Sequence, residues 1–125
     1  MIAHADTHIL VWLYYGEKNK LSAAARDAVE EHELVASPIA LLEMELLHEI
    51  GRTRQTASTI ADTLATDVGL RVCDLPFRDV VNQALKESWT SDPFDRLIVA
   101  NARVAGAPLV TKDERIRKHY ARAVW

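Results

Sequence analysis

The chain has 125 residues, 49% hydrophobic and 26% charged, which suits one domain with its own core and leaves no room for a second. A net charge of −3 argues against a general polyanion binder, and the single cysteine excludes an internal disulfide. No apolar run approaches the ~20 residues that span a bilayer, and the first residues do not resemble a signal peptide. We therefore expect a cytoplasmic protein with no membrane segment.

Short apolar stretches alternate with longer helical patterns along the chain. In chain order, the patterns predict a strand at 2–5, helices at 7–15 and 22–31, a strand at 34–36, helices at 37–51 and 56–67, a strand at 71–73, helices at 77–87 and 92–106, a strand at 109–111, a helical turn, and an edge strand at 121–125. Such alternation indicates βαβ units. We expect a single α/β domain over residues 1–125, with a mostly parallel sheet of four to five short strands and helices on both faces.

Two acidic residues follow predicted strands directly. Asp6 comes after the first strand, and Asp113 comes after the fourth. Ligands of open parallel sheets bind at the carboxyl ends of the strands. Asp6 and Asp113 should therefore lie at the same edge of the sheet.

Each acid in such a turn also has a purely local explanation. Asp6 precedes a helix and could be its N-cap. Asp92 and Asp95 have the spacing of a capping box, and Asp113 could favour the start of the last helical turn. Taken singly, these three turns do not decide between a structural and a functional role.

Glu43 is harder to explain as a local structural residue. Projected on a helix, it falls within an apolar sector formed by Ile39, Leu42, Leu46, Leu47 and Ile50. Asp95 likewise projects among apolar positions, away from Arg96 and Arg103. A buried carboxylate needs a proton, a partner or a cation, so the alternative to a metal is a buried arginine beside Glu43.

Several carboxylates that meet at one edge would repel each other unless a divalent cation lay among them. Oxygen ligands without cysteine or clustered histidine favour Mg²⁺ or Mn²⁺ over zinc. Carboxylate-held Mg²⁺ suits phosphodiester hydrolysis, since it can activate water and stabilise the leaving oxygen. The hypothesis is thus a metal-dependent phosphodiesterase.

Four segments, in this order and at this spacing, resemble the PIN-domain family, and within it the VapC-type toxins of bacterial toxin–antitoxin pairs. They cover essentially the whole chain: Asp6-Thr7-His8, Ser37-Pro38-Ile39-Ala40-Leu41-Leu42-Glu43-Met44, Asp92-Pro93-Phe94-Asp95-Arg96-Leu97-Ile98-Val99-Ala100 and Pro108-Leu109-Val110-Thr111-Lys112-Asp113. The resemblance implies a three-layer PIN-like domain and a Mg²⁺-dependent endoribonuclease.

The resemblance also implies roles for individual residues. The acidic quartet would be Asp6, Glu43, Asp95 and Asp113. Metal contacts would come from Asp6 and Asp95, and from Asp113 directly or through water, while Glu43 would orient or deprotonate the attacking water. Asp92 would be a fifth acid, either a ligand or a cap that positions Asp95. The hydroxyls that would bind these carboxylates or a phosphate are those of Thr7 and Thr111.

The family further implies a homodimer, a cognate VapB-like antitoxin and structured RNA substrates such as tRNA or ribosomal RNA. Exposed apolar surface for the protein contacts could come from Trp12, Leu13, Tyr14, Tyr15 and Leu47. Phosphate contacts could come from Lys112, Arg115 and Arg96, although these residues also fit a solvated helical surface.

Two rival functions stay open. The first is a catalytically inactive PIN-like module that binds RNA or protein. The second is a phosphohydrolase with Asp6 as covalent nucleophile. The second needs another acid two residues later, where this chain has His8.

Overall fold

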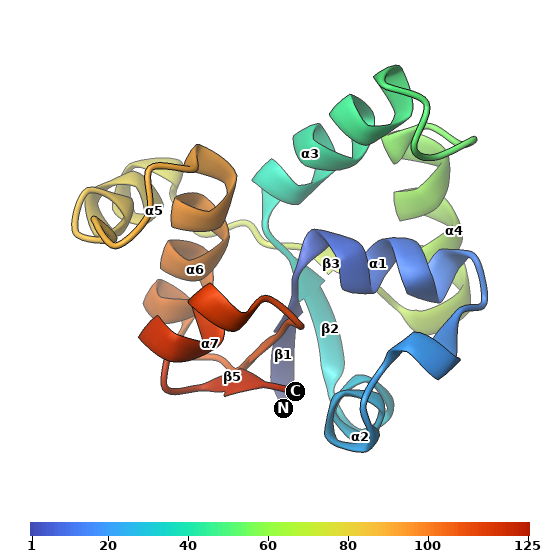
Figure 1. Ribbon diagram of the computed structural model, residues 1–125, viewed down its shortest axis with the longest axis horizontal. Coiled ribbons are helices and arrows are strands. Elements are labelled where there is room, and N and C mark those ends of the chain that lie inside the picture. Colours follow the sequence, from blue (N-terminus) through green and yellow to red (C-terminus); the bar gives the residue numbers. More distant parts are fainter.

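Five short strands form one sheet at the centre of the computed structural model, which describes residues 1–125 (Figure 1). The strands are β1 (Ile2–Ala5), β2 (Glu33–Ala36), β3 (Arg71–Val72), β4 (Leu109–Val110) and β5 (Ala123–Val124). Their order is β3-β2-β1-β4-β5, and every neighbouring pair is parallel. The predicted sheet is confirmed, and it is parallel throughout.

Helices occupy the connections between the strands. They are α1 (Thr7–Tyr14), α2 (Ala23–Glu31), α3 (Pro38–Glu49), α4 (Ala57–Val68), α5 (Phe77–Ala84), α6 (Pro93–Ala105) and α7 (Glu114–His119). A 3-10 turn at Lys18–Lys20 was not predicted. None of the helices combines the length and the hydropathy that a bilayer-spanning segment needs.

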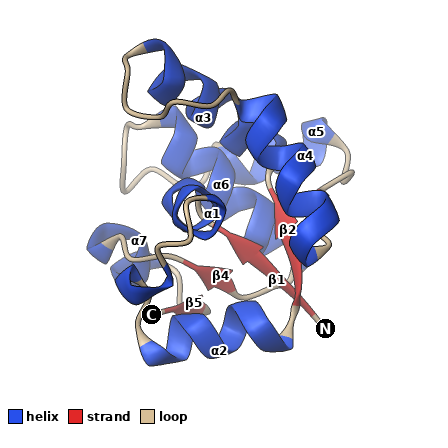
Figure 2. Ribbon diagram, turned by 90° about the vertical axis from the view of Figure 1, so that its right-hand side faces the viewer, coloured by secondary structure: helices blue, strands red, loops and turns tan.

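Alternating strand residues divide the core into two layers of packing. Ala3, Ala5 and Val110 join a large apolar cluster with α1, α2 and α4, whereas Leu109 packs with α6 and α7 on the opposite side. Because successive strand residues point to opposite faces, these clusters identify the two faces of the sheet. Figures 1 and 2 show the resulting three layers, with α1 and α2 on one side and α6 on the other. The predicted three-layer α/β domain is confirmed.

The helix predicted for 77–87 ends earlier than expected, at Ala84. The N–H groups of Lys86 and Glu87 donate to carbonyls three residues back rather than four, so the last turn tightens. The Glu87 side chain is buried and accepts a hydrogen bond from Trp89 Nε1.

The apolar sector predicted for the helix after Ser37 is wrong. The buried residues of α3 are Ala40 and Met44, whereas Leu42, Leu46 and Ile50 are exposed. The reason is the position of α3, which lies beyond the carboxyl ends of the strands and packs against α1, α4 and α6 rather than against the sheet (Figure 1). Only a narrow face of α3 is therefore covered.

Candidate active site

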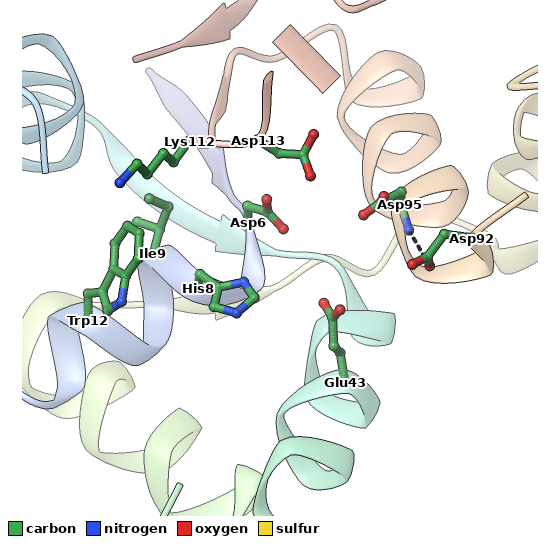
Figure 3. A pocket seen from close by; sticks show the side chains of 9 residues that line it. All are labelled: Asp6, His8, Ile9, Trp12, Glu43, Asp92, Asp95, Lys112 and Asp113. Atoms are coloured by element: carbon green, nitrogen blue, oxygen red, sulfur yellow. Dashed lines mark hydrogen bonds between the residues drawn. The ribbon is translucent and has the colours of Figure 1, made fainter. Parts of the chain in front are cut away.

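Five carboxylates from four separate parts of the chain line one cavity of about 410 Å³ at the carboxyl edge of the sheet (Figure 3). The remaining lining residues are His8, Ile9, Trp12 and Lys112. The acids are Asp6, Glu43, Asp92, Asp95 and Asp113. The structure therefore brings together all of the acids that the sequence singled out, and it places Asp6 and Asp113 at the same sheet edge.

Asp6 is held from two directions. Its Oδ1 accepts the Thr7 N–H at 2.8 Å at the start of α1, and its Oδ2 accepts the Thr111 hydroxyl at 2.6 Å. Burial raises the pKa of Asp6, and the hydrogen bonds from Thr111 and Thr7 oppose that rise. Asp6 is thus both the N-cap of α1 and a residue of the cavity.

Asp113 is tied to this arrangement by Thr111. The Thr111 hydroxyl accepts the Asp113 N–H at 3.1 Å, and Oδ1 of Asp113 accepts the Ile116 N–H at 2.9 Å. Asp113 is thus the N-cap of α7 and also lines the cavity.

Asp92 and Asp95 occupy the first turn of α6. Oδ1 of Asp92 accepts the Phe94 N–H at 2.8 Å and the Asp95 N–H at 3.3 Å, so Asp92 is the N-cap. Asp95 is half-buried, and burial followed by the charges of Asp92, Asp113, Asp6 and Glu43 raises its pKa to about 7.

Glu43 reaches the cavity from α3, across from Asp6 (Figure 3). Burial raises its pKa, the neighbouring Thr7 hydroxyl opposes the rise, and the charge of Asp6 adds to it. The Thr7 hydroxyl is fully buried and has no partner of ordinary hydrogen-bond geometry. No arginine or lysine forms an ion pair with Glu43, so the alternative of a buried arginine partner is wrong.

The donor set fits a hydrated divalent cation. None of the three ion pairs of the chain involves an acid of this cavity, and three of its acids have a raised pKa. No three acidic, histidine or cysteine side chains are already close enough to ligate one ion. Mg²⁺ keeps several waters and usually binds protein through one or two carboxylates, so it needs no such cage. The residues that could hold it are Asp6 and Asp95, with Asp113 in contact directly or through a bound water.

The predicted phosphate-binding residues differ in their surroundings. Lys112 lines the cavity, and its Nζ lies 6.0 Å from the ring centres of both Trp12 and Trp125. Arg115 is exposed on α7 and does not line the cavity. Nε of Arg96 donates to the Thr90 carbonyl at 2.6 Å, and Arg96 does not line the cavity.

Two aromatic rings were not assigned to the site from the sequence. His8 is exposed and lines the cavity, and Trp12, expected to contact a protein partner, stands one turn further along α1 with its ring 6.2 Å from that of His8. Their spacing could have identified them from the sequence. His8 comes two residues after Asp6, and Trp12 follows His8 by four residues, which is one helical turn. The aromatic and leucine residues proposed as exposed protein contacts are half-buried.

Comparison with known proteins gives a consistent result. The profile of the PIN domain family matches residues 5–122. Ribonuclease VapC22 from Mycobacterium tuberculosis (strain ATCC 25618 / H37Rv) is 34% identical over 116 residues, which cover 91% of this chain and 88% of that protein.

Two solved structures share the fold. A toxin–antitoxin complex from Klebsiella pneumoniae has a TM-score of 0.61 at 20% identity, covering 89% of this chain and 86% of that one. VapBC2 from Rickettsia felis, bound to a DNA fragment from its promoter, has a TM-score of 0.65 at 15% identity, covering 98% and 96%.

Proposed function

This chain belongs to the PIN domain family, and from that premise we propose that it is a Mg²⁺-dependent endoribonuclease toxin of the VapC type, neutralised by a cognate VapB-like antitoxin. The observation that carries the proposal is the set of five carboxylates around one cavity, with no basic ion-pair partner among them. The 34% identity to a protein named as a ribonuclease supports the reaction class.

In the proposed mechanism, Asp6 and Asp95 would hold the cation, and Asp113 would contact it directly or through water. Bound Mg²⁺ would supply charge that lowers the pKa of water and stabilises the leaving oxygen of the phosphodiester. Asp6 is preset for this role because the Thr7 N–H and the Thr111 hydroxyl fix both of its oxygens. Asp92 fixes the first turn of α6 and so positions Asp95.

Glu43 would accept the proton of the attacking water. It comes from a different helix than the three proposed metal ligands, and it faces them across the cavity (Figure 3). Its raised pKa lies closer to neutral pH than that of an ordinary glutamate, as a general base requires. The Thr7 hydroxyl would keep this carboxyl oriented.

The proposed partners follow from the same premise. Two structural neighbours are complexes of toxins with antitoxins, and we propose that the C-terminal segment of an antitoxin enters the acidic cavity. A homodimer is proposed as well, since Leu42, Leu46 and Ile50 leave an exposed apolar stripe on α3. Structured RNAs such as tRNA or ribosomal RNA are the proposed substrates, and these polymers would place the toxin in the cytoplasm.

The deciding experiment compares RNA cleavage by the wild type, by Asp95→Asn and by Asp67→Asn. Asp67 is an exposed aspartate near the end of α4, outside the cavity, and serves as the matched control. Wild type and Asp67→Asn should cleave tRNA or ribosomal RNA when Mg²⁺ is present, and EDTA should stop both. Asp95→Asn should be inactive under all conditions.

A catalytically inactive binding module gives the opposite pattern. RNA would then bind without being cut, and growth arrest on expression would be unchanged in Asp95→Asn. Sequencing the ends of the RNA fragments would identify the cleaved RNA.

A further inference from the structure

A second groove opens beside the acidic cavity and shares His8 and Trp12 with it. It has a volume of about 400 Å³ and lies between α1 and the loop that joins α3 to α4. Its lining is otherwise unlike that of the cavity, because three basic residues stand along it. These are Lys20, Arg52 and Arg54.

The loop that carries the arginines is fixed in place. The Tyr15 hydroxyl accepts the N–H groups of Arg54 at 3.0 Å and Gln55 at 3.3 Å. Thr53, between the two arginines, is only 6% exposed, and its carbonyl lies 3.0 Å from His48 Nδ1. The two arginines therefore flank an anchored residue and project from a set position.

Both arginines keep their charge available. Arg52 and Arg54 are exposed, and neither takes part in an ion pair. Lys20 is paired with Glu17 and contributes less. The groove thus carries two uncompensated positive charges next to a cavity that carries five carboxylates.

An aromatic ring joins the groove to the cavity. Two ammonium groups lie near the Trp12 ring: Nζ of Lys20 is 5.8 Å from the ring centre, and Nζ of Lys112 is 6.0 Å from it. Figure 3 shows Trp12 and Lys112 on the opposite side of the cavity from Asp92 and Asp95. An aromatic ring with cations close by matches the two parts of a nucleotide, a stacking base and a charged phosphate.

We propose that this groove binds single-stranded RNA next to the scissile phosphate, with phosphates on Arg52 and Arg54 and a base on Trp12. The inference rests on the proposed ribonuclease function and adds a substrate subsite to it. From His8 to Tyr15 the groove follows α1 for seven residues, roughly 10 Å at about 1.5 Å per residue. That length holds about three nucleotides at the ~3.4 Å spacing of a stacked strand.

Charge explains why the reaction needs such a subsite. A phosphodiester that approaches the cavity meets five carboxylates, and Lys112 is the only basic residue of the cavity lining apart from His8. Cations along the neighbouring groove offset this repulsion by holding the adjacent phosphates. An acidic peptide would also bind the arginines, but only a nucleotide would in addition stack a base on the Trp12 ring, so RNA is favoured.

The test uses Arg52→Gln/Arg54→Gln in the full chain, with Arg78→Gln/Lys86→Gln as a matched loss of two charges. Arg78 and Lys86 are exposed in and just after α5, and neither lines the groove or the cavity. Binding of a short mixed-sequence single-stranded RNA is measured by fluorescence anisotropy in an Asp95→Asn background, over a range of salt concentrations.

Loss of the arginine pair should weaken binding about ten-fold and reduce the slope of log affinity against log salt by about 1.4, or ~0.7 per phosphate contact. The control pair should change the slope little. Trp12→Leu should weaken binding about five-fold or more, and Trp12→Phe should retain most of it because phenylalanine can still stack. With Asp95 intact, the arginine variant should raise KM for bulk tRNA more than it lowers kcat.

Unchanged affinity, salt slope and KM in the arginine variant would overturn the inference. So would a variant that cleaves and binds RNA normally but escapes neutralisation by an antitoxin, because the groove would then be a protein-docking site. In both cases cleavage by the wild type leaves the proposed function standing. A wild type that binds the short RNA through these arginines yet cuts no RNA would instead refute the ribonuclease function.

Discussion

The hydroxyl of Thr111 donates a hydrogen bond of 2.6 Å to Oδ2 of Asp6, across 105 residues of sequence. The same hydroxyl accepts the N–H of Asp113 at 3.1 Å. The fully buried Thr111 side chain therefore connects two acids of the cavity, one after β1 and the other after β4. This link makes Thr111 a positioning residue in the proposed site.

Thr111→Val should lower the cleavage rate about 10- to 100-fold, because a hydrogen bond to a charged group is worth about 1.5–3 kcal/mol. Valine has nearly the same shape, so the fold should survive. Since the Thr111 hydrogen bond opposes the rise in the pKa of Asp6, the variant should also need a higher pH for half-maximal activity. Thr111→Ser should restore both values, and a rate that Thr111→Val leaves unchanged would remove the positioning role.

Asp95→Asn should stabilise the metal-free protein at high pH. Because the pKa of Asp95 is raised from 3.8 to about 7, its charged form costs folding free energy that grows as the pH rises towards 7. The gain should be roughly 2 kcal/mol above pH 8, about half of what the pKa alone implies, because water screens a partly exposed site. Urea unfolding of both proteins, with EDTA present, measures the difference.

The same comparison has an internal check. Below about pH 4 both proteins carry a neutral side chain at position 95, so their stabilities should converge. Added Mg²⁺ should raise the melting temperature of the wild type and should affect Asp95→Asn much less. A variant that is less stable than the wild type at pH 8 without metal would contradict the electrostatic account.

Glu87→Gln should destabilise the fold by about 1–3 kcal/mol at neutral pH, through lost hydrogen bonds to a buried charged group. Glu87 accepts hydrogen bonds from Trp89, Gln83 and Arg103, which ties the end of α5 to α6. Burial alone would raise its pKa, but these bonds and the charge of Arg103 lower it overall. Its stabilisation is thus complete above pH 4.5 and is lost as the pH falls through the lowered value. Exposed Glu30, changed to Gln, is the control in thermal unfolding.

His4 should weaken the fold as the solution becomes mildly acidic. It is 2% exposed in β1, and burial lowers its pKa from 6.5 to about 4. Between these pH values His4 is protonated in the unfolded chain but stays neutral in the folded chain. The free energy of unfolding therefore falls as the pH drops from 6.5 to 4. The full loss is on the order of 3 kcal/mol.

This effect should be measured in the Asp95→Asn background. Protonation of Asp95 stabilises the folded chain over the same pH range and would mask the loss caused by His4. His4→Leu should flatten the pH dependence of urea unfolding in that background. An equal slope with and without His4 would show that another group controls stability in mild acid.

Much of the fold was predictable because its signals are local. Strand-forming runs and helical patterns are short-range features, and the predicted bounds of α2, α4 and α6 agree with the structure to within one residue. The meeting of Asp6 with Asp113 followed from topology, since both come after parallel strands. These predictions needed no knowledge of side-chain packing.

Other features depend on where elements pack, which the sequence does not state. Glu43 does reach the cavity, but the reasoning from its apolar neighbours was wrong, since Leu42 and Leu46 are exposed. The basic groove depends on the Tyr15 hydroxyl meeting the Arg54 N–H, a contact between residues 39 positions apart. Arg96 had the right charge in the right segment, yet a backbone carbonyl engages it.

Three of the cavity acids, Asp6, Asp92 and Asp113, are also the residues that start helices. Alanine at any of them would damage folding along with chemistry, whereas asparagine keeps the cap. Selection for a folded chain alone would therefore keep a capping side chain, aspartate or asparagine, at these three positions after enzymatic activity had been lost. Asp95 and Glu43 begin no helix, so folding places no such constraint on them. In a descendant that has lost catalysis, substitutions should therefore appear first at these two positions.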